Sequence, residues 1–271
     1  MASDKKRGVK PKPSRVIMLI ETSNYLNRLE GNQFSIFTQK FHLSAAKTLK
    51  EFDGSILKKD NSSYLISFDS VGDAILCALK VQFKFKYVTP KFDANIRRLN
   101  IALILDDSGI QKRTISDEST RLVTRLCEIV KDQVVVSARV RALYDDGQSE
   151  ALDQESIRCL TFNEEVFLTV LMDYMQMHWN DSDLDVSRLS KELGYSRSQL
   201  YRRLMSICGM SSSTFIREFR LHKALGLLHT RSGSIAQIAG KTGFNSPSYF
   251  TKAFTDKYGI LPSKYTQQHG S

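Results

Sequence analysis

The sequence predicts a multidomain protein in which an α+β domain is followed by an all-α domain. Strand and helix patterns alternate from residue 15 to residue 145, whereas from Glu164 onward the pattern is helical to the end. The charge is divided in a similar way. Residues 186–271 carry 13 Lys and Arg but only three acids, and this surplus equals the whole formal net charge of +10. A basic module attached to a neutral body indicates a polyanionic partner.

The length and composition exclude several classes of protein. A chain of 271 residues is long enough for two ordinary domains, and 41% hydrophobic residues are too many for a wholly disordered chain. No run approaches the roughly 18 apolar residues that a membrane-spanning helix needs. The apolar run at 16–20 ends at Glu21, too soon for a signal peptide. We therefore expect a cytoplasmic protein without a membrane partner.

The cysteines give no sign of a metal site. Cys77, Cys127, Cys159 and Cys208 are far apart and form no C-x-x-C pair. Such spacing supplies neither a disulfide framework nor a structural zinc site. The sequence also lacks the motifs G-x-x-x-x-G-K-[ST], G-x-S-x-G and H-E-x-x-H. We expect no metal and no cofactor.

The first domain is expected over residues 15–145, after a basic disordered arm at 1–14. Its elements follow from apolar runs, helical spacing and polar turns. Strands are predicted at 15–20, on both sides of a turn at 60–63 within 54–68, at 99–105 and at 134–137; helices are predicted at 34–51, from Asp69 or Ser70 through Val81, and at 119–130. This order, with a hairpin between two helices, predicts a ferredoxin-like α+β sandwich.

A linker is expected between the two domains, at residues 146–162. It begins with the polar stretch Asp-Gly-Gln-Ser-Glu, which has no strand or helix pattern. The helical domain is then expected over residues 163–271.

A short helix, a turn and a polar-faced second helix are predicted near the start of the basic region. Asp185 or Ser187 can cap the first helix, and Gly194 suits the left-handed position that ends it. Ser196 then caps a helix over residues 197–207, whose apolar side chains recur at helical spacing and face inward: Leu200, Leu204 and Ile207. This arrangement is a helix-turn-helix.

The same arrangement recurs after a longer helix at 212–229. Gly243 supplies the second turn, and Ser246 caps the helix that follows it. The sequences of the two turns, at 193–196 and 242–246, are alike. The C-terminal domain is therefore predicted to be an all-α double helix-turn-helix.

With these motifs the sequence resembles the AraC/XylS-type DNA-binding domain over residues 163–266. The stretches that carry the resemblance are 193–204, 209–211, 215–221, 243–254 and 258–265. The resemblance implies that the second helix of each unit enters the major groove of double-stranded DNA, and that the two units read successive grooves.

The resemblance and the side-chain chemistry together nominate the DNA contacts. Arg202 can donate two hydrogen bonds to guanine, and polar or aromatic neighbours can add contacts to base edges. The expected base-contacting residues are Ser198, Tyr201, Arg202, Ser248, Tyr249 and Lys252. The expected phosphate-contacting residues are Ser196, Arg197, Arg203, Arg217, Arg220, Lys241, Asn245 and Ser246. The alternative for any of these residues is a solvated surface with no DNA contact.

Residues 15–145 resemble, less closely, a class III nucleotide cyclase homology domain. The resemblance rests on residues 52–68, 74–82 and 124–137. Cyclase domains of this family work as dimers, so the resemblance implies a homodimer. The alternative is an unrelated α/β sandwich of the same element order.

The resemblance does not extend to the catalytic carboxylates. The family needs two aspartates to hold two metal ions against a triphosphate. The place of the first falls near Glu21, and the second aligns with Asn61-Ser62, with Asp60 close but out of register. Gly72-Asp73 opens a helix instead of a hairpin and is rejected. Near Arg121 the family has a transition-state asparagine, while Arg125 stands at the place of its partner arginine.

These observations predict a non-enzymatic, sequence-specific DNA-binding transcriptional regulator. The first domain is expected to form the homodimer, and an effector, a small molecule or a nucleotide of unidentified chemistry, is an open possibility. Two alternatives remain: a nucleotide cyclase fused to a DNA-binding domain, and an adaptor whose first domain recruits another protein.

Overall fold

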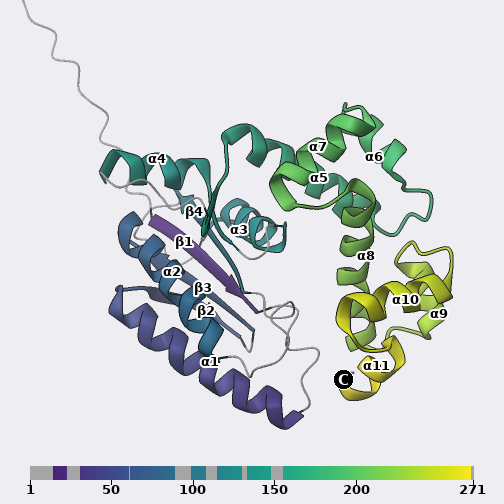
Figure 1. Ribbon diagram of the computed structural model, residues 1–271, viewed down its shortest axis with the longest axis horizontal. Coiled ribbons are helices and arrows are strands. Elements are labelled where there is room, and N and C mark those ends of the chain that lie inside the picture. Colours follow the sequence, from purple (N-terminus) through teal and green to yellow (C-terminus); the bar gives the residue numbers. More distant parts are fainter. Residues whose placement is uncertain are drawn as a thin grey trace, which may run out of the picture.

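The computed structural model describes residues 15–22, 31–60, 62–88, 99–107, 115–129, 133–147 and 155–269. The arm expected at 1–14 and Asn61 lie outside these residues. Figure 1 shows two parts, a sheet covered by helices and a group of helices that leads to the C-terminus. Within the described ranges, no helix is both long enough and apolar enough to cross a membrane.

A six-stranded sheet forms the centre of the N-terminal part. Its strands are β1 Arg15–Glu21, β2 Ser55–Lys59, β3 Ser63–Phe68, β4 Asn100–Asp106, β5 Val134–Val136 and β6 Ile157–Cys159. They lie in the order β2-β3-β1-β4-β5-β6. The pairs among β1 to β4 are antiparallel, and Met18 of β1 lies opposite Ile66 and Leu103. Strands β5 and β6 extend the sheet from β4 in parallel.

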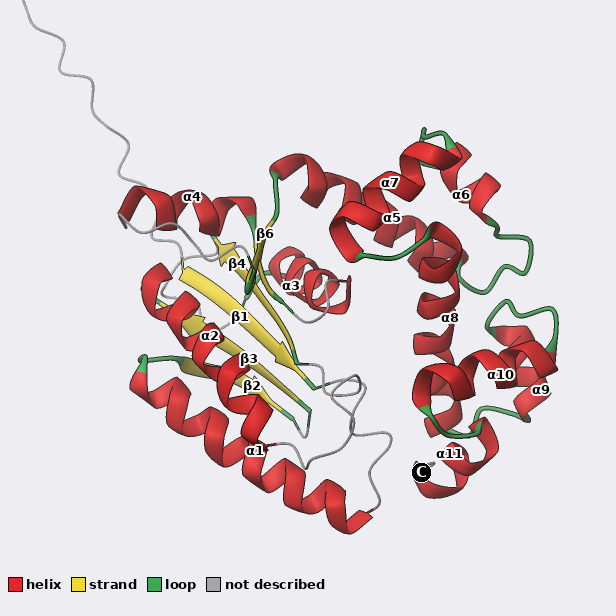
Figure 2. Cartoon of the chain, in the orientation of Figure 1, coloured by secondary structure: helices red, strands yellow, loops and turns green. Residues whose placement is uncertain are grey.

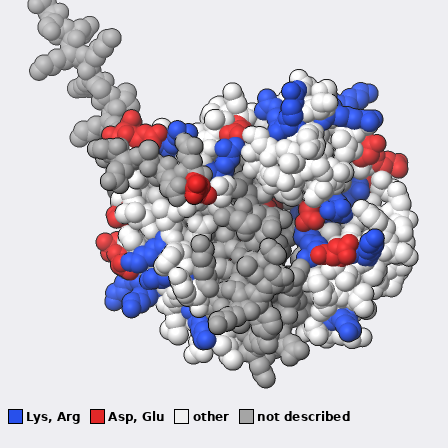
Figure 3. All heavy atoms as spheres, viewed as in Figure 1, with Lys and Arg blue, Asp and Glu red and all other residues white. Residues whose placement is uncertain are grey.

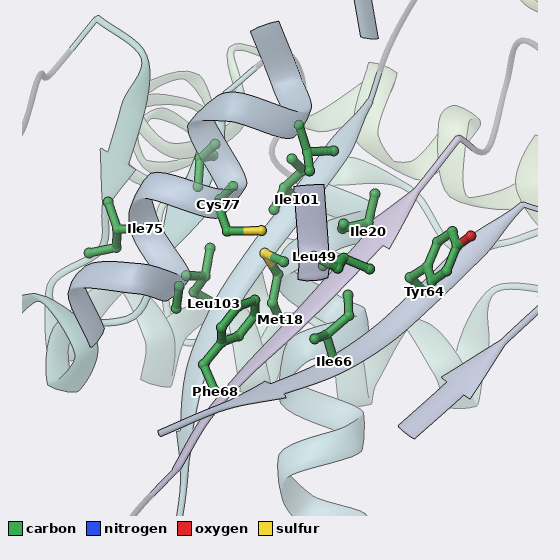
Figure 4. Close-up of a cluster of buried hydrophobic side chains, with 14 of the residues drawn as sticks. Met18, Ile20, Leu49, Tyr64, Ile66, Phe68, Ile75, Cys77, Ile101 and Leu103 are labelled. Atoms are coloured by element: carbon green, nitrogen blue, oxygen red, sulfur yellow. The ribbon is translucent and has the colours of Figure 1, made fainter. Parts of the chain in front are cut away.

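Helices α1 (Gly31–Glu51) and α2 (Val71–Val88) cover one face of the sheet. Alternate residues of a strand point to opposite faces, so Met18 and Ile20 of β1 share this face. They pack against Leu49 of α1 in a buried apolar cluster, part of which is drawn in Figure 4.

Helix α3 (Asp117–Ile129) covers the other face of the sheet. Ile17 and Leu19, the alternate residues of β1, are buried in one cluster with Val123 and Leu126. Strand β1 is therefore apolar on both faces, as expected of a strand between two layers.

The strands and helices predicted up to residue 137 are confirmed, and each starts within three residues of its expected position. At the start of α2, Ser70 is the cap, because its Oγ accepts a hydrogen bond of 3.2 Å from the backbone N–H of Asp73. Gly72 and Asp73 lie in the first turn of this helix, as the sequence analysis held when it rejected them as a hairpin pair.

The linker expected at 146–162 is wrong in part. Helix α4 (Ala138–Gly147) runs into its start, and strand β6 lies within it. A three-residue strand has too few side chains to show alternation. It forms because its backbone pairs with β5. Two further hydrogen bonds lie at the ends of this pairing: the N–H of Val134 donates to the carbonyl of Ser156 (3.0 Å), and the N–H of Leu160 donates to the carbonyl of Val136 (2.9 Å).

The C-terminal part consists of helices in the described residues, as predicted. They are α5 Phe162–His178, α6 Val186–Glu192, α7 Arg197–Cys208, α8 Ser212–His229, α9 Ile235–Lys241, α10 Pro247–Tyr258 and α11 Pro262–His269. Figure 2 shows α8 running from the α6–α7 pair to the α9–α10 pair. The long helix thus connects the two helix-turn-helix units.

One apolar core joins the sheet to the first helix-turn-helix unit. The cluster that contains Ile17 and Leu126 continues through Leu171 of α5 to Leu189 of α6 and Leu204 of α7. The second unit has a core of its own, in which the aromatic side chains Phe250 and Phe254 are fully buried. The first unit is therefore built onto the N-terminal domain.

Candidate nucleic-acid interface

The first helix-turn-helix consists of α6, a turn and α7. Asp185 caps α6, since its carboxylate accepts a hydrogen bond of 2.8 Å from the N–H of Arg188. Gly194 has φ +73°, a conformation that glycine adopts without strain. Ser196 and Gln199 form a capping box at the start of α7, which fixes the direction in which this helix leaves the turn.

The polar face of α7 is open to solvent. Ser198, Tyr201 and Arg202 are all exposed, Tyr201 to 48%. They border a shallow groove whose opposite wall includes Ser211 and Ser213, at the start of α8. The sequence analysis did not nominate these two serines, although the run of three serines after residue 210 is a visible signal. The groove brings together the first three expected base-contacting residues.

The second unit consists of α9, a turn and α10. Gly243 has φ +75°, and the Oγ of Ser246 accepts a hydrogen bond of 3.2 Å from the N–H of Tyr249. Tyr249, with Ser248 and Lys252, forms the exposed side of α10. The two units thus present the same side of their second helix, as the repeated turn predicted.

A further groove lies between the two units. Its walls include Asn245, Ser246 and Tyr249 of the second unit, Val186 of the first, and Arg217 of α8. Arg217 and Tyr249 also line a hollow beside Lys252. The structure therefore places Arg217, Asn245 and Ser246 beside α10, the second helix of the second unit.

Two of the nominated cations lie on exposed surface and also contact their own unit. Arg197 donates to the hydroxyl of Ser187 in α6, and the ammonium of Lys241 donates to the carbonyl of Ser232 at 2.8 Å. In Figure 3, Lys and Arg side chains gather over the end of the molecule that carries α6 and α7. The basic surplus seen in the sequence is thus displayed on the helix-turn-helix part.

Arg220, one of the residues expected to contact phosphate, also has partners within the fold. Its guanidinium donates to three backbone carbonyls in the loop before α6: Trp179 at 3.0 Å, Asp181 at 2.6 Å and Leu184 at 3.1 Å. Burial lowers the pKa of Arg220 from its ordinary value. A Cβ at Gly243 would lie 2.8 Å from its Nε, so the second turn packs directly on this guanidinium. Arg220 therefore fixes the second unit relative to the first.

Arg203 is likewise held within the fold. Its guanidinium lies over the rings of Tyr195, at 4.8 Å, and Phe167, at 5.4 Å. A stacked guanidinium of this kind stabilises the packing of α7 on α5. Arg203, also expected to contact phosphate, thus has a packing role in the structure.

Asp60 and Arg125, which the cyclase resemblance singled out, each have partners within the fold. The carboxylate of Asp60 accepts backbone hydrogen bonds from Ser62 (2.9 Å) and Ser63 (2.7 Å). Burial raises the pKa of Asp60, but these hydrogen bonds outweigh it and hold the pKa below its ordinary value. The carboxylate of Asp60 thus stabilises the turn between β2 and β3.

Arg125 forms an ion pair with Asp173 of α5. In the parts of the chain that the structure describes, no group of three or more His, Cys, Asp or Glu could hold a metal ion.

The geometry defines a class of domain, and comparison with known proteins agrees with it. Residues 189–268 match the model of a helix-turn-helix domain. Residues 189–268 therefore form a helix-turn-helix domain, the class that the sequence motifs predicted.

Three curated relatives illustrate the match. Histidine kinase P4 of Formosa agariphila is 37% identical over 89 residues, which are 33% of this chain and 6% of the relative. The HTH-type transcriptional regulator MtrA of Neisseria gonorrhoeae is 31% identical over 37% of this chain and 32% of its own length. An uncharacterized HTH-type transcriptional regulator of Staphylococcus aureus is 23% identical over 92% of this chain. The chain spans a third or less of the length of these relatives.

Solved structures are also similar to part of the chain. The C-terminal domain of the response regulator AraT from Geobacillus stearothermophilus is 27% identical over 39% of this chain and 87% of its own, with a TM-score of 0.37. The DNA-binding domain of AdpA, solved in complex with a target DNA, is 26% identical over 36% of this chain and 88% of its own, with a TM-score of 0.35.

The replacement Arg220→Met should separate the structural task from a phosphate contact. We expect the free energy of unfolding to fall by about 1–3 kcal/mol, because buried carbonyls lose their donor. The slope of DNA affinity against salt concentration should stay unchanged, whereas loss of a phosphate contact would lower that slope by about one. Arg217→Met removes an expected phosphate contact on the same helix and is the control for a lowered slope. If Arg220→Met lowers the slope and leaves the stability unchanged, Arg220 contacts a phosphate and does not stabilise the fold.

Proposed function

We propose that this chain is a sequence-specific DNA-binding transcription regulator, and that it reads successive major grooves with α7 and α10. The observation that carries the proposal is the pair of exposed polar helix faces, each bordered by a groove and each fixed by a capped turn. An α-helix fits the major groove, where each base pair presents a distinct set of donors and acceptors. The expected base contacts remain those of Ser198, Tyr201 and Arg202, with Ser248, Tyr249 and Lys252 in the second unit.

Selection of bound sequences from a random pool of duplex DNA tests this proposal. We expect one enriched motif, with binding that weakens steeply as salt is added because Lys and Arg displace counterions from phosphates. Enrichment of no motif would contradict sequence-specific binding.

The replacement Arg202→Ala should weaken binding to the selected motif by roughly 1–3 kcal/mol and relax the preference at one base pair, because a bidentate contact to guanine is lost. The affinity is measured by titration of the selected duplex and of duplexes altered at single positions. Ser206→Ala, an exposed change on the same helix, serves as the control. If Arg202→Ala keeps the affinity and the base preferences of the parent, Arg202 has no role in readout.

We further propose that the N-terminal domain is a ferredoxin-like sandwich that forms a homodimer and catalyses no reaction. The support for the fold is the element order β1-α1-β2-β3-α2-β4 with the strand order β2-β3-β1-β4. The support for a pairing surface is a set of exposed apolar side chains on α1 and α2: Leu43, Leu76, Phe83 and Tyr87. A dimer would place two double helix-turn-helix units on DNA, so the selected motif should contain two half-sites. A single undivided half-site would contradict the dimer.

A further inference from the structure

A cavity lies where the N-terminal sheet meets both helix-turn-helix units. Its walls come from the end of β1 and the start of β4, from α3 and α5, from the turn before α8, and from α8 and α10. The residues that the inference uses are Glu21, Glu128, Phe215, Glu218, Phe219 and Lys257. This cavity shares no residue with the groove along α7, and it shares Glu218 and Lys257 with the hollow beside Lys252.

The charge around this cavity is unbalanced. Glu21, Glu128 and Glu218 contribute three carboxylates to its walls. The ammonium of Lys257 lies 2.7 Å from Glu218, so this pair is neutral as a unit. His222 lies 3.8 Å from Glu128 and is charged only when protonated. The cavity therefore has a surplus of negative charge at the end that Glu21 and Glu128 form.

Glu21 in particular faces acids. The charged groups that act on it are Glu128 and Asp60, and the thiol of Cys127 is its hydrogen-bond partner. Burial, followed by the charges of Glu128 and Asp60, raises the pKa of Glu21 to about 7. Lys223 and Arg125 act on Glu128, whose pKa burial nevertheless raises. A cation placed beside Glu21 would be stabilised by both carboxylates.

The remainder of the wall is apolar. Phe215 and Phe219 of α8, Ile129 of α3, Met172 and Met210 contribute this apolar surface. Aromatic faces attract cations, and methionine side chains adapt to irregular ligands. The cavity thus combines carboxylates with apolar side chains, in walls drawn from both domains.

We propose that this cavity binds a small organic cation, an ammonium group on an apolar body, with the ammonium at Glu21 and Glu128 and the body against Phe215 and Phe219. The occupant would contact the N-terminal domain and α8, the helix that connects the two helix-turn-helix units, at once. Binding at this site does not depend on the proposed DNA-binding function.

Three isosteric probes test the proposal on the full chain at pH 8, where Glu21 is ionised. They are 2-phenylethylamine, which is cationic, 2-phenylethanol, which is neutral, and phenylacetate, which is anionic. The amine should raise the midpoint of thermal unfolding by roughly 3–6 °C at tenfold its dissociation constant. The alcohol and the carboxylate should leave it unchanged. Equal shifts with the amine and the alcohol, or no shift with the amine, overturn the proposal.

The replacement Glu21→Gln should weaken amine binding, measured by calorimetric titration, roughly 10- to 100-fold. Glu118→Gln, an exposed change at the start of α3, should leave the affinity unchanged. Equal affinities of the parent and Glu21→Gln would place the ligand elsewhere. Because these readouts contain no DNA, a chain that binds the amine but selects no DNA motif would refute the proposed function and leave this site intact.

Discussion

The replacement Leu171→Ala should lower the free energy of unfolding by about 2–5 kcal/mol and destabilise two parts of the protein together. Leu171 lies in α5 with 0% of its surface exposed. Its cluster contains Ile17 of the sheet and Leu204 of the first recognition helix. Loss of three side-chain carbons here leaves a cavity in a core that both parts share, so neither part can keep its packing without the other.

Urea unfolding followed by two signals measures this effect. The fluorescence of Trp179, the only tryptophan, reports on the end of α5, and far-ultraviolet circular dichroism reports on all helices and strands. The two transitions should shift together to lower urea. Val170→Ala, the exposed neighbour, should change stability by no more than about 0.5 kcal/mol. If the fluorescence transition shifts while the circular-dichroism transition stays in place, the two parts do not share a core.

The replacement Glu21→Gln should stabilise the protein at pH 8 by about 3 kcal/mol, and the gain should vanish toward pH 4.5. Burial raises the pKa of Glu21 from 4.5 to about 7, with the charges of Glu128 and Asp60 as the next causes. Between these two pH values the unfolded chain loses the proton while the native protein keeps it. Native stability therefore falls as the pH rises through this window, and the full cost is present above pH 7. Glutamine does not titrate and removes this cost.

Denaturant titrations at pH 5, 6, 7 and 8 measure the prediction. The difference in unfolding free energy between Glu21→Gln and the parent should grow with pH and level off above pH 7. Glu118→Gln, at an exposed position, is the control and should show a small difference that does not vary with pH. A difference that is constant over this range would mean that Glu21 ionises normally in the native protein.

Local signals made the helix-turn-helix units predictable. Ser196 and Ser246 cap their helices through hydrogen bonds to backbone groups three residues away, and Gly194 and Gly243 take up positive φ within their turns. These effects depend on residues close together in the chain, so the sequence alone reveals them. The residues expected to contact bases lie on exposed surface of α7 and α10. This exposure was predictable because helical spacing separates inward from outward positions.

The roles of Arg203 and Arg220 were not predictable in this way. Both residues lie in basic stretches that suggest phosphate contacts. Arg220 instead binds carbonyls some 40 residues earlier in the chain, and Arg203 stacks on Phe167 of α5. A long side chain can reach several possible partners, and the sequence does not show which of them lies near it in the folded chain. Strand β6 was missed for a similar reason, since its pairing with β5 and not its composition makes it a strand.

The sequence by itself determined the class of the C-terminal domain, the helix faces that it exposes, and the order of strands and helices up to residue 137. Each of these depends on periodicity, capping or charge along the chain. The tertiary structure alone decided that α3 and α5 cover the second face of the sheet, and that Glu21 meets Glu128 in a cavity between the domains. Strand β1 is apolar on both faces, and nothing in an apolar pattern states which distant helix will cover it. That choice follows from packing complementarity among elements far apart in the chain.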